Sequence, residues 1–339
     1  MDKIIIPMSY MGSGSSAVTD LLREYEGINT KNSDFEYVFL YAPDGLFDLE
    51  YKLLYNNNAI RSDEAIKSFR KLMKELYIYG GWGIANYKEK ISQNFINIVD
   101  SYLNSIVTSK YHGIWYYHQK PSKVDWIIRV IKRVLFKKTT KLKQLQLEMS
   151  MVSSEDFYEK SRKFIVDVIK QISDTEENIV LDQLLLPHNL NLIDNYKIDG
   201  LLPIIVSRDP RDVFIMNKYF WKPRNQEVPY PTDVKTFCNY YKMMRQNEKK
   251  TDTLTLRLNF EDLVLHYEET KEKIESFIGI DAIHHKEKFR YFNPNISVNN
   301  LQVYNRDVNY LPEVEIIESE LSEYLYNFKN DIISNGDVF

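Results

Sequence analysis

The stretch that most constrains what this chain can fold into is residues 3–25, KIIIPMSYMGSGSSAVTDLLREY. Its β-branched run at 4–6 predicts a short buried strand. A loop rich in serine and glycine follows. A helix is predicted next, because apolar residues share one helix face at Val18, Leu21, Leu22 and Tyr25. A strand, a glycine-bearing loop and a helix in this order direct backbone N–H groups and a helix dipole at an anion, usually a phosphate.

The loop differs from a Walker A motif. Ser15 and Ser16 follow Gly14, so the Gly-Lys-Ser/Thr ending is absent. The lysine that would reach a β/γ-phosphate is absent with it. When this stretch is considered alone, a tight turn between strand and helix that binds no ligand is therefore an equal alternative.

Composition narrows the class of protein. The chain has 339 residues, of which 44% are hydrophobic, enough for a sizeable core. Its formal net charge of −4 gives no global reason to expect nucleic acid as a partner. The single cysteine, Cys238, excludes an internal disulfide framework and fits a reducing compartment. We find no secretory signal and no apolar run near the roughly 18 to 20 residues that a membrane span needs, so we expect a cytoplasmic protein.

The rest of the chain alternates strand and helix patterns. With helices between them, four further strands are predicted at 36–41, 178–186, 201–206 and 254–258. Residues 46–118 are predicted to be largely helical, with a break at the glycine-rich residues 80–83. Strands joined by long helical connections indicate right-handed crossovers and a parallel α/β sheet flanked by helices. Ligands of such sheets bind at the carboxyl ends of the strands, so the loops that follow the strands are expected to line one rim.

A basic segment interrupts this alternation. Residues 120–143 contain nine lysines and arginines against one acidic residue, Asp125. Apolar residues recur there at helical spacing, at Trp126, Ile127, Val130, Ile131, Val134 and Leu135. One interpretation is a solvated basic helix packed on the core. The other is a surface that holds an anionic acceptor or rests, as a peripheral contact at the inner face of a membrane, on anionic lipid headgroups.

Three segments resemble blocks of the sulfotransferases that use 3′-phosphoadenosine-5′-phosphosulfate (PAPS), and they occur in the family's order. Residues 10–17, YMGSGSSA, are similar to the loop that binds the 5′-phosphosulfate. Residues 204–217, IIVSRDPRDVFIMN, are similar to the segment that binds the 3′-phosphate. Residues 256–279 resemble the family's strand–Tyr-Glu-Asp-Leu–helix block. A weaker similarity, at 297–304, is to a C-terminal loop folded over the cofactor.

The resemblance implies a fold and an activity. It implies one domain over residues 1–339 with the P-loop-like sulfotransferase fold, and a helical insertion at 46–150 that forms the acceptor side. The implied reaction moves the sulfuryl group of PAPS to a hydroxyl group, releases 3′,5′-ADP and needs no metal ion. The resemblance, including the turn at 43–45, points to bacterial polysaccharide-type members, which favours a carbohydrate or polysaccharide acceptor.

The same resemblance assigns cofactor-binding residues. A helix N-terminus with serine hydroxyls suits the 5′-phosphosulfate, and a guanidinium such as that of Arg208 matches the 3′-phosphate bidentately. The alternative for Arg208 is a surface salt bridge with Asp209 or Asp212. The assigned set is Gly12, Ser13, Gly14, Ser15 and Ser16 for the 5′ end, and Arg208, Asn217, Phe260, Ser297 and Asn300 for the rest of the nucleotide.

Three residues depart from the family's pattern. Gly12 stands where the family has a basic residue that helps neutralise the bridging oxygen as the sulfate leaves. Met216 aligns with a serine of the family, so the neighbouring Asn217 is expected to take its place at the 3′-phosphate. Phe260 replaces a tyrosine, which keeps the aromatic ring but loses the hydroxyl.

The general base is assigned by position. The acceptor hydroxyl must lose its proton as it attacks, and a carboxylate or an imidazole can accept that proton. Several carbohydrate-directed members of the family use a glutamate shortly after the first helix, which makes Glu36 the first candidate and His188 the second. Asp182 and Gln183 are expected to orient an acceptor. The alternatives are a rim glutamate that only pairs with a lysine and a turn histidine without a role.

Two other functions stay open on the sequence. A P-loop kinase of a small molecule or sugar uses related chemistry, although the absent Walker lysine and the Arg-Asp-Pro-Arg-Asp segment count against it. The second is a relative that binds nucleotide or glycan without turnover, because Gly12 and Met216 depart from the family's pattern. The sequence has no His, Cys and Asp cluster with metal-ligand spacing, so no metal is expected.

Overall fold

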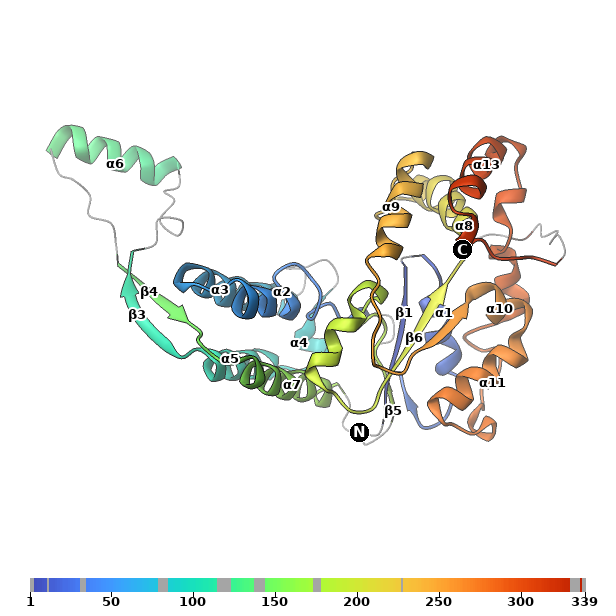
Figure 1. Cartoon of the computed structure of the whole chain (residues 1–339), viewed down its shortest axis with the longest axis horizontal. Coiled ribbons are helices and arrows are strands. Elements are labelled where there is room, and N and C mark those ends of the chain that lie inside the picture. The colour runs from blue at the N-terminus through green and yellow to red at the C-terminus, as the bar shows by residue number, and fades with distance from the viewer. Residues whose placement is uncertain are drawn as a thin grey trace.

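The computed structural model describes residues 3–10, 12–30, 35–78, 85–114, 123–136, 144–172, 178–226, 228–329 and 336. Figure 1 shows three parts: a sheet with its flanking helices, a layer of helices beside it, and an arm that extends from this layer. None of the helices in these described ranges is both long and apolar enough to cross a bilayer.

A five-stranded parallel sheet forms the centre of the largest part. Its strand order is β2 (Ile28–Asn29), β5 (Asn178–Val180), β1 (Ile4–Ser9), β6 (Leu201–Ser207) and β7 (Leu256–Asn259). Each neighbouring pair runs parallel, and β1 is buried along its whole length between β5 and β6. The prediction of a parallel α/β sheet flanked by helices is confirmed.

The two faces of the sheet bury separate cores. Ile4 and Ile6 of β1 belong to the larger core, which includes the helical layer. Ile5 belongs to the smaller core, together with Val18 and Leu21 of α1 (Ser15–Leu22). Successive side chains of a strand point to opposite faces, so a strand that is covered on both faces is continuously apolar. This burial explains the uninterrupted run at the start of the chain.

The remaining elements of the sheet part follow β5, β6 and β7 in the chain. Helices α8, α9 and α13 pack together, and α10 and α11 help to enclose the smaller core. The α-helices are α8 (Pro210–Ile215), α9 (Val234–Gln246), α10 (Phe260–Leu265), α11 (Tyr267–Ile278), α12 (Pro294–Ser297) and α13 (Leu311–Glu320). The 3₁₀- and π-helical segments are η3 (Pro187–Tyr196), η4 (Met216–Trp221), η5 (Lys222–Arg224), η6 (Ala282–His284), η7 (Val298–Asn300), η8 (Val303–Asn305), η9 (Val308–Tyr310) and η10 (Ser322–Tyr324).

The helical layer is inserted between β2 and β5. It contains α2 (Leu46–Glu50), η1 (Tyr51–Tyr55), α3 (Ala59–Tyr77), α4 (Tyr87–Lys90), α5 (Phe95–Ile106) and α7 (Ser154–Lys170). For the described residues 46–78 and 85–114, the prediction of a largely helical segment is confirmed, except that β3 (Ser109–Gly113) is a strand. It pairs antiparallel with β4 (Leu145–Met149), and the two carry α6 (Lys123–Phe136) at the end of the arm (Figure 1). The predicted break at 80–83 lies outside the described residues.

The predicted strand at 36–41 is wrong, and the edge of the sheet is β2 instead. The backbone turns at this point, because the N–H of Ala42 donates to the carbonyl of Val38 at 2.8 Å. Tyr37 and Leu40 are buried in the larger core. An apolar run is produced by burial and not by strand pairing, so the same pattern fits a buried loop.

The strand predicted at 178–186 ends early, at Val180. Gln183 has a φ of +51°, which extended chain does not adopt, and η3 begins at Pro187. Leu184 and Leu185 remain buried, which accounts for the apolar pattern. The shorter strand places Asp182 and Gln183 in the loop that follows it.

Candidate functional site

Two positions in the loop between β1 and α1 require glycine, because of their backbone conformation and of the side chains that lie against them. Gly12 has a φ of +70° and Gly14 a φ of +94°. A Cβ atom at Gly14 would lie 2.7 Å from Cδ2 of Phe260, so the backbone lies directly against that ring. Ser15 begins α1, and no side chain caps its first turn. Uncapped N–H groups at a helix start bind anions, which makes this turn a candidate anion site.

Trp221 accounts for a glycine at position 12, where the sulfotransferases that the sequence resembles have a basic residue. A Cβ atom at Gly12 would lie 3.0 Å from two ring atoms of Trp221, the last residue of η4. Any larger side chain at this position must displace the indole ring or move the loop. This contact could not be predicted from sequence patterns, because the two residues are distant in the chain.

Arg208 brings together the segments that resemble sulfotransferase blocks. It follows β6 directly and is 5% exposed. Its guanidinium donates to the carbonyl oxygens of Gly12 at 3.4 Å and Asn300 at 2.5 Å, and lies 3.1 Å from Sδ of Met216. The guanidinium carbon is 4.9 Å from the centre of the Phe260 ring. One buried cation therefore touches all four segments.

The guanidinium of Arg208 does not use all of its N–H donors within the protein. Among the described residues, its Nε has no hydrogen-bond partner and no carboxylate lies within ion-pair distance of it. Asp209 is paired with Arg211 at 2.7 Å, and Asp212 accepts the N–H of Gln302 at 2.9 Å. The alternative of a surface salt bridge with Asp209 or Asp212 does not describe this side chain. Arg208 therefore makes no direct ion pair, although its charge acts on the nearby buried carboxylates of Asp212 and Glu261, and its free donor can serve an anionic ligand.

Asp212 fastens the C-terminal loop at 297–304 to the turn between β6 and α8. Its buried carboxylate accepts the N–H groups of Gln302 and Tyr304, at 2.9 and 3.4 Å. Burial raises the pKa of Asp212 to about 7, although the nearby charge of Arg208 acts in the opposite direction. The loop is thus held beside Arg208 by contacts that the Arg-Asp-Pro-Arg-Asp segment itself provides.

Three other residues assigned to the nucleotide are buried and differ in their contacts. Asn217 holds the loop that follows it: its side chain accepts the N–H of Val228 at 2.9 Å and donates to the carbonyl of Tyr230 at 3.3 Å. Asn300 reaches the site through its backbone carbonyl. Ser297 is buried at the end of α12. The nucleotide contacts predicted for Asn217 and Ser297 stay predictions.

A pair of carboxylates lies beside the first residue of α1. Oε1 of Glu36 accepts a hydrogen bond from Nε2 of Gln183 at 2.8 Å. Asp182 is buried, and its Oδ1 has no hydrogen-bond partner among the described residues. Burial is the main cause that raises the pKa of Asp182 to about 7, and the negative charge of Glu36 is the second. A hydrogen bond from Ser15 lowers the pKa of Asp182 and so opposes both. Partial desolvation also raises the pKa of Glu36, opposed by the bond from Gln183.

His188 lies in a different environment. It is exposed in the first turn of η3. Partial desolvation lowers the pKa of its imidazole, opposed by the charge of Glu248. Glu248 itself accepts hydrogen bonds from Tyr10 and Arg257. In the described part of the chain, no hydrogen bond joins His188 to Glu36, so the two predicted bases do not form one unit.

A polar cavity of about 440 Å³ opens where β6 and β7 end. Its lining includes Ser207, Arg208, Arg245, Asn259, Asp262 and Tyr324. Arg245 lies 4.1 Å from the ring centre of Tyr10, and its Nη1 donates to Oγ of Ser207 at 3.4 Å. The lining also includes the carboxylates of Asp209, Asp262 and Glu323, of which Asp209 is paired with Arg211, so the cavity carries charges of both signs. Sequence reasoning missed Arg245, because nothing local separates it from the other basic residues of its helix.

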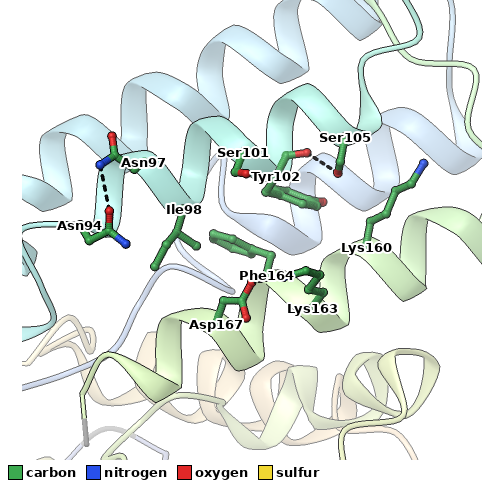
Figure 2. A pocket seen from close by; sticks show the side chains of 10 residues that line it. All are labelled: Asn94, Asn97, Ile98, Ser101, Tyr102, Ser105, Lys160, Lys163, Phe164 and Asp167. Carbon is green, nitrogen blue, oxygen red and sulfur yellow. Dashed lines mark hydrogen bonds and ion pairs between the residues drawn. The ribbon is translucent and has the colours of Figure 1, made fainter. Parts of the chain in front are cut away.

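A second cavity, of about 350 Å³, lies between α5 and α7. Figure 2 shows Ile98, Tyr102 and Phe164 between the two helices, with polar side chains around them. Lys163 and Asp167, which line it, form an ion pair at 2.6 Å. None of the residues assigned to the cofactor or to the base lines this cavity.

Comparisons with known proteins show a weak structural likeness. No protein-family model and no curated protein matches the sequence. A solved structure titled "Sulfotransferase Domain from the Synechococcus PCC 7002 Olefin Synthase" superposes on 96% of this chain and 95% of its own, with 11% sequence identity and a TM-score of 0.37. A TM-score this low carries no argument about activity.

Proposed function

We propose that this protein binds PAPS and transfers its sulfuryl group to a hydroxyl of a carbohydrate or polysaccharide. The observation that carries the proposal is the meeting of four segments at Arg208, whose buried guanidinium contacts Gly12, Phe260 and Asn300. Those segments are the ones that resemble sulfotransferase blocks. A buried cation near an uncapped helix start suits a ligand with two separate anionic groups. The carbohydrate acceptor rests on the resemblance alone.

We assign each anionic group of PAPS to the part of the site that can neutralise its charge. PAPS supplies the sulfuryl group when bound and leaves as 3′,5′-ADP. The N–H groups at the start of α1, with the hydroxyl groups of Ser15 and Ser16, bind the 5′ end. Arg208 binds the 3′-phosphate, and Arg245 adds a second positive charge in the adjoining cavity. This arrangement uses no lysine from the loop, which distinguishes it from a Walker-type kinase site.

Glu36 is the proposed general base. Gln183 orients its carboxylate through a 2.8 Å hydrogen bond. Partial desolvation disfavours the charged form of Glu36, so an ionised Glu36 gains from accepting the acceptor's proton. The side chain of Asp182 lies beside Ser15 and is proposed to orient the acceptor. His188 is the second candidate, and the Discussion gives the comparison of the two variants.

A relative that binds the nucleotide without turnover is the alternative that one observation favours. Trp221 occupies the space of a side chain at position 12, where the family has a basic residue. Without that cation, the charge that develops on the leaving phosphate is stabilised less. Binding of 3′,5′-ADP with no transfer to any acceptor would select this alternative.

The test measures the melting temperature of the protein with different nucleotides and, in parallel, the transfer of the labelled sulfuryl group to acceptors. The protein is heated with 3′,5′-ADP, 5′-AMP or ATP, and labelled PAPS is then offered with a panel of carbohydrate acceptors. The proposal predicts that 3′,5′-ADP raises the melting temperature most, because it alone carries the 3′-phosphate. A larger rise with ATP would favour a kinase and contradict the proposal. Label recovered in a carbohydrate would identify the acceptor class.

A further inference from the structure

The arm formed by β3, α6 and β4 ends in a helix that lies away from the rest of the molecule (Figure 1). The two strands pair from Ser109 opposite Met149 to Gly113 opposite Leu145. The ribbon therefore leads the chain out to α6 and back. This geometry sets α6 apart from the other long helices, which pack in the layer or around the sheet.

The root of the arm is fixed to α3. Glu148 of β4 forms ion pairs with Arg70 at 2.8 Å and with Lys110 of the paired strand at 3.3 Å. The N–H of Glu148 donates to Asp63 at 2.9 Å, and the N–H of Ser150 donates to Ser62 at 2.7 Å. These buried contacts give the arm a defined origin on the helical layer.

The apolar residues of α6 are exposed to an unusual degree. Each of its apolar side chains that the structure describes is at least 40% exposed, and Val134 reaches 72%. Trp126 is 60% exposed. In α5, by contrast, the apolar stripe that includes Phe95 and Leu103 is buried. For the described residues 123–136, the interpretation of the basic segment as a helix packed on the core is therefore wrong, and a large apolar surface is left for a partner.

The charges around this surface indicate which partner it fits. Arg129, Lys132 and Arg133 share one helix face by their spacing, while Ile127, Val130, Ile131 and Val134 share another. Residues 120–143 carry a formal charge of +8, and the rest of the chain, with 35 basic and 47 acidic residues, carries −12. Pairing α6 with α6 of a second copy would bring +8 against +8. An apolar face bordered by basic residues fits a surface that is apolar inside and anionic at its edge.

We propose that α6 is an interfacial helix that docks this protein on the surface of an anionic lipid bilayer. Its 14 residues span about 21 Å, enough to lie in the plane of the surface. The apolar face enters the boundary between headgroups and acyl chains, while the basic side chains extend to the lipid phosphates. The inference is independent of the sulfotransferase proposal, because none of the residues assigned to cofactor or base lies on the arm.

The experiment is vesicle co-sedimentation of the full chain. Vesicles of phosphatidylcholine are compared with vesicles that also contain phosphatidylglycerol, at low and high salt. We expect binding to the anionic vesicles only, weakened by salt. The triple variant R129Q/K132Q/R133Q should lower the partition coefficient by about a hundredfold, since each basic residue near an anionic surface contributes about fivefold. A second variant, Trp126→Ser with Val134→Ser, should lose binding while keeping all charges.

The matched control is K71Q/K74Q/K163Q, which removes the same charge from exposed positions on α3 and α7. It should bind vesicles as the natural sequence does. Circular dichroism and melting temperature should be unchanged in the α6 variants, because none of the side chains of α6 that the structure describes is buried in the core. Three results would overturn the proposal: no vesicle binding, an equal loss in the control, or self-association in sedimentation velocity that the α6 variants abolish. The last would make the helix a contact between copies.

Discussion

Replacing Arg208 with alanine removes the one cation that touches all four segments of the candidate nucleotide site. In the free protein, the substitution deletes hydrogen bonds to two backbone carbonyls and the contact with the Phe260 ring. Each such hydrogen bond contributes about 1 kcal/mol to the free energy of unfolding. Arg208 makes no direct ion pair, so the substitution breaks none, but it removes a charge that favours the ionised forms of Asp212 and Glu261. We therefore expect a modest fall in stability and a folded variant.

The effect on binding should be larger and should depend on the ligand. If Arg208 binds the 3′-phosphate, the variant should bind 3′,5′-ADP more weakly by about 1.5 to 3 kcal/mol, the range for hydrogen bonds to charged groups. That is roughly a 10- to 150-fold rise in Kd. Binding of 5′-AMP should change little, because it lacks the 3′-phosphate. Isothermal titration calorimetry with both nucleotides measures the difference directly.

Arg211→Ala is the matched control, from the same turn. Arg211 pairs with Asp209 and with Glu318, each at 2.7 Å, and these contacts are structural. Its loss should lower the melting temperature while the ratio of 3′,5′-ADP to 5′-AMP affinity stays the same. If Arg208→Ala weakens both nucleotides equally, the side chain is structural too, and the assignment of the 3′-phosphate is refuted.

Three further predictions concern the base, pH and the loop. Glu36→Gln should lower kcat by about 10²- to 10⁴-fold with 3′,5′-ADP affinity preserved, whereas His188→Ala should keep most activity; the opposite result in steady-state kinetics would make His188 the base. Because the pKa of Asp182 is raised from 3.8 to about 7 in the folded protein, its contribution to stability should fall as pH rises between these values. Asp182→Asn should flatten that fall and stabilise the protein above pH 7, by at most about 4 kcal/mol, and identical pH profiles in urea unfolding would contradict this. Gly14→Ala should destabilise the folded protein by about 1 to 3 kcal/mol, and by more than Gly27→Ala does. Both glycines have a positive φ, but of the two only Gly14 lacks space for a Cβ atom. Equal losses of stability would show that backbone strain alone matters.

Local patterns were sufficient for the central strands and for the turns that follow them. β-branched runs placed β1 and β6, and long helical connections between strands predicted the parallel sheet that the structure contains. The edge of the sheet was not predictable in this way. β2 is only two residues long and pairs with β5, far away in the chain, while the more apolar residues at 36–41 form a buried loop. Strand pairing is a non-local contact, and hydrophobic pattern reports burial alone.

For the candidate site, too, some features could be predicted from local sequence and others only from the tertiary structure. The sequence by itself predicted an anion-binding role for the first loop, and it determined the arginine after β6 and the basic, amphipathic nature of residues 120–143, because these follow from residue type and spacing. Only the tertiary structure decided that Arg208 makes no direct ion pair and contacts the backbone of Gly12 and Asn300 instead. It also decided that Trp221 fills the space at Gly12 and that the apolar side chains of α6 stay exposed. These outcomes depend on which segments far apart in the chain meet and which do not, and local sequence carries no record of that.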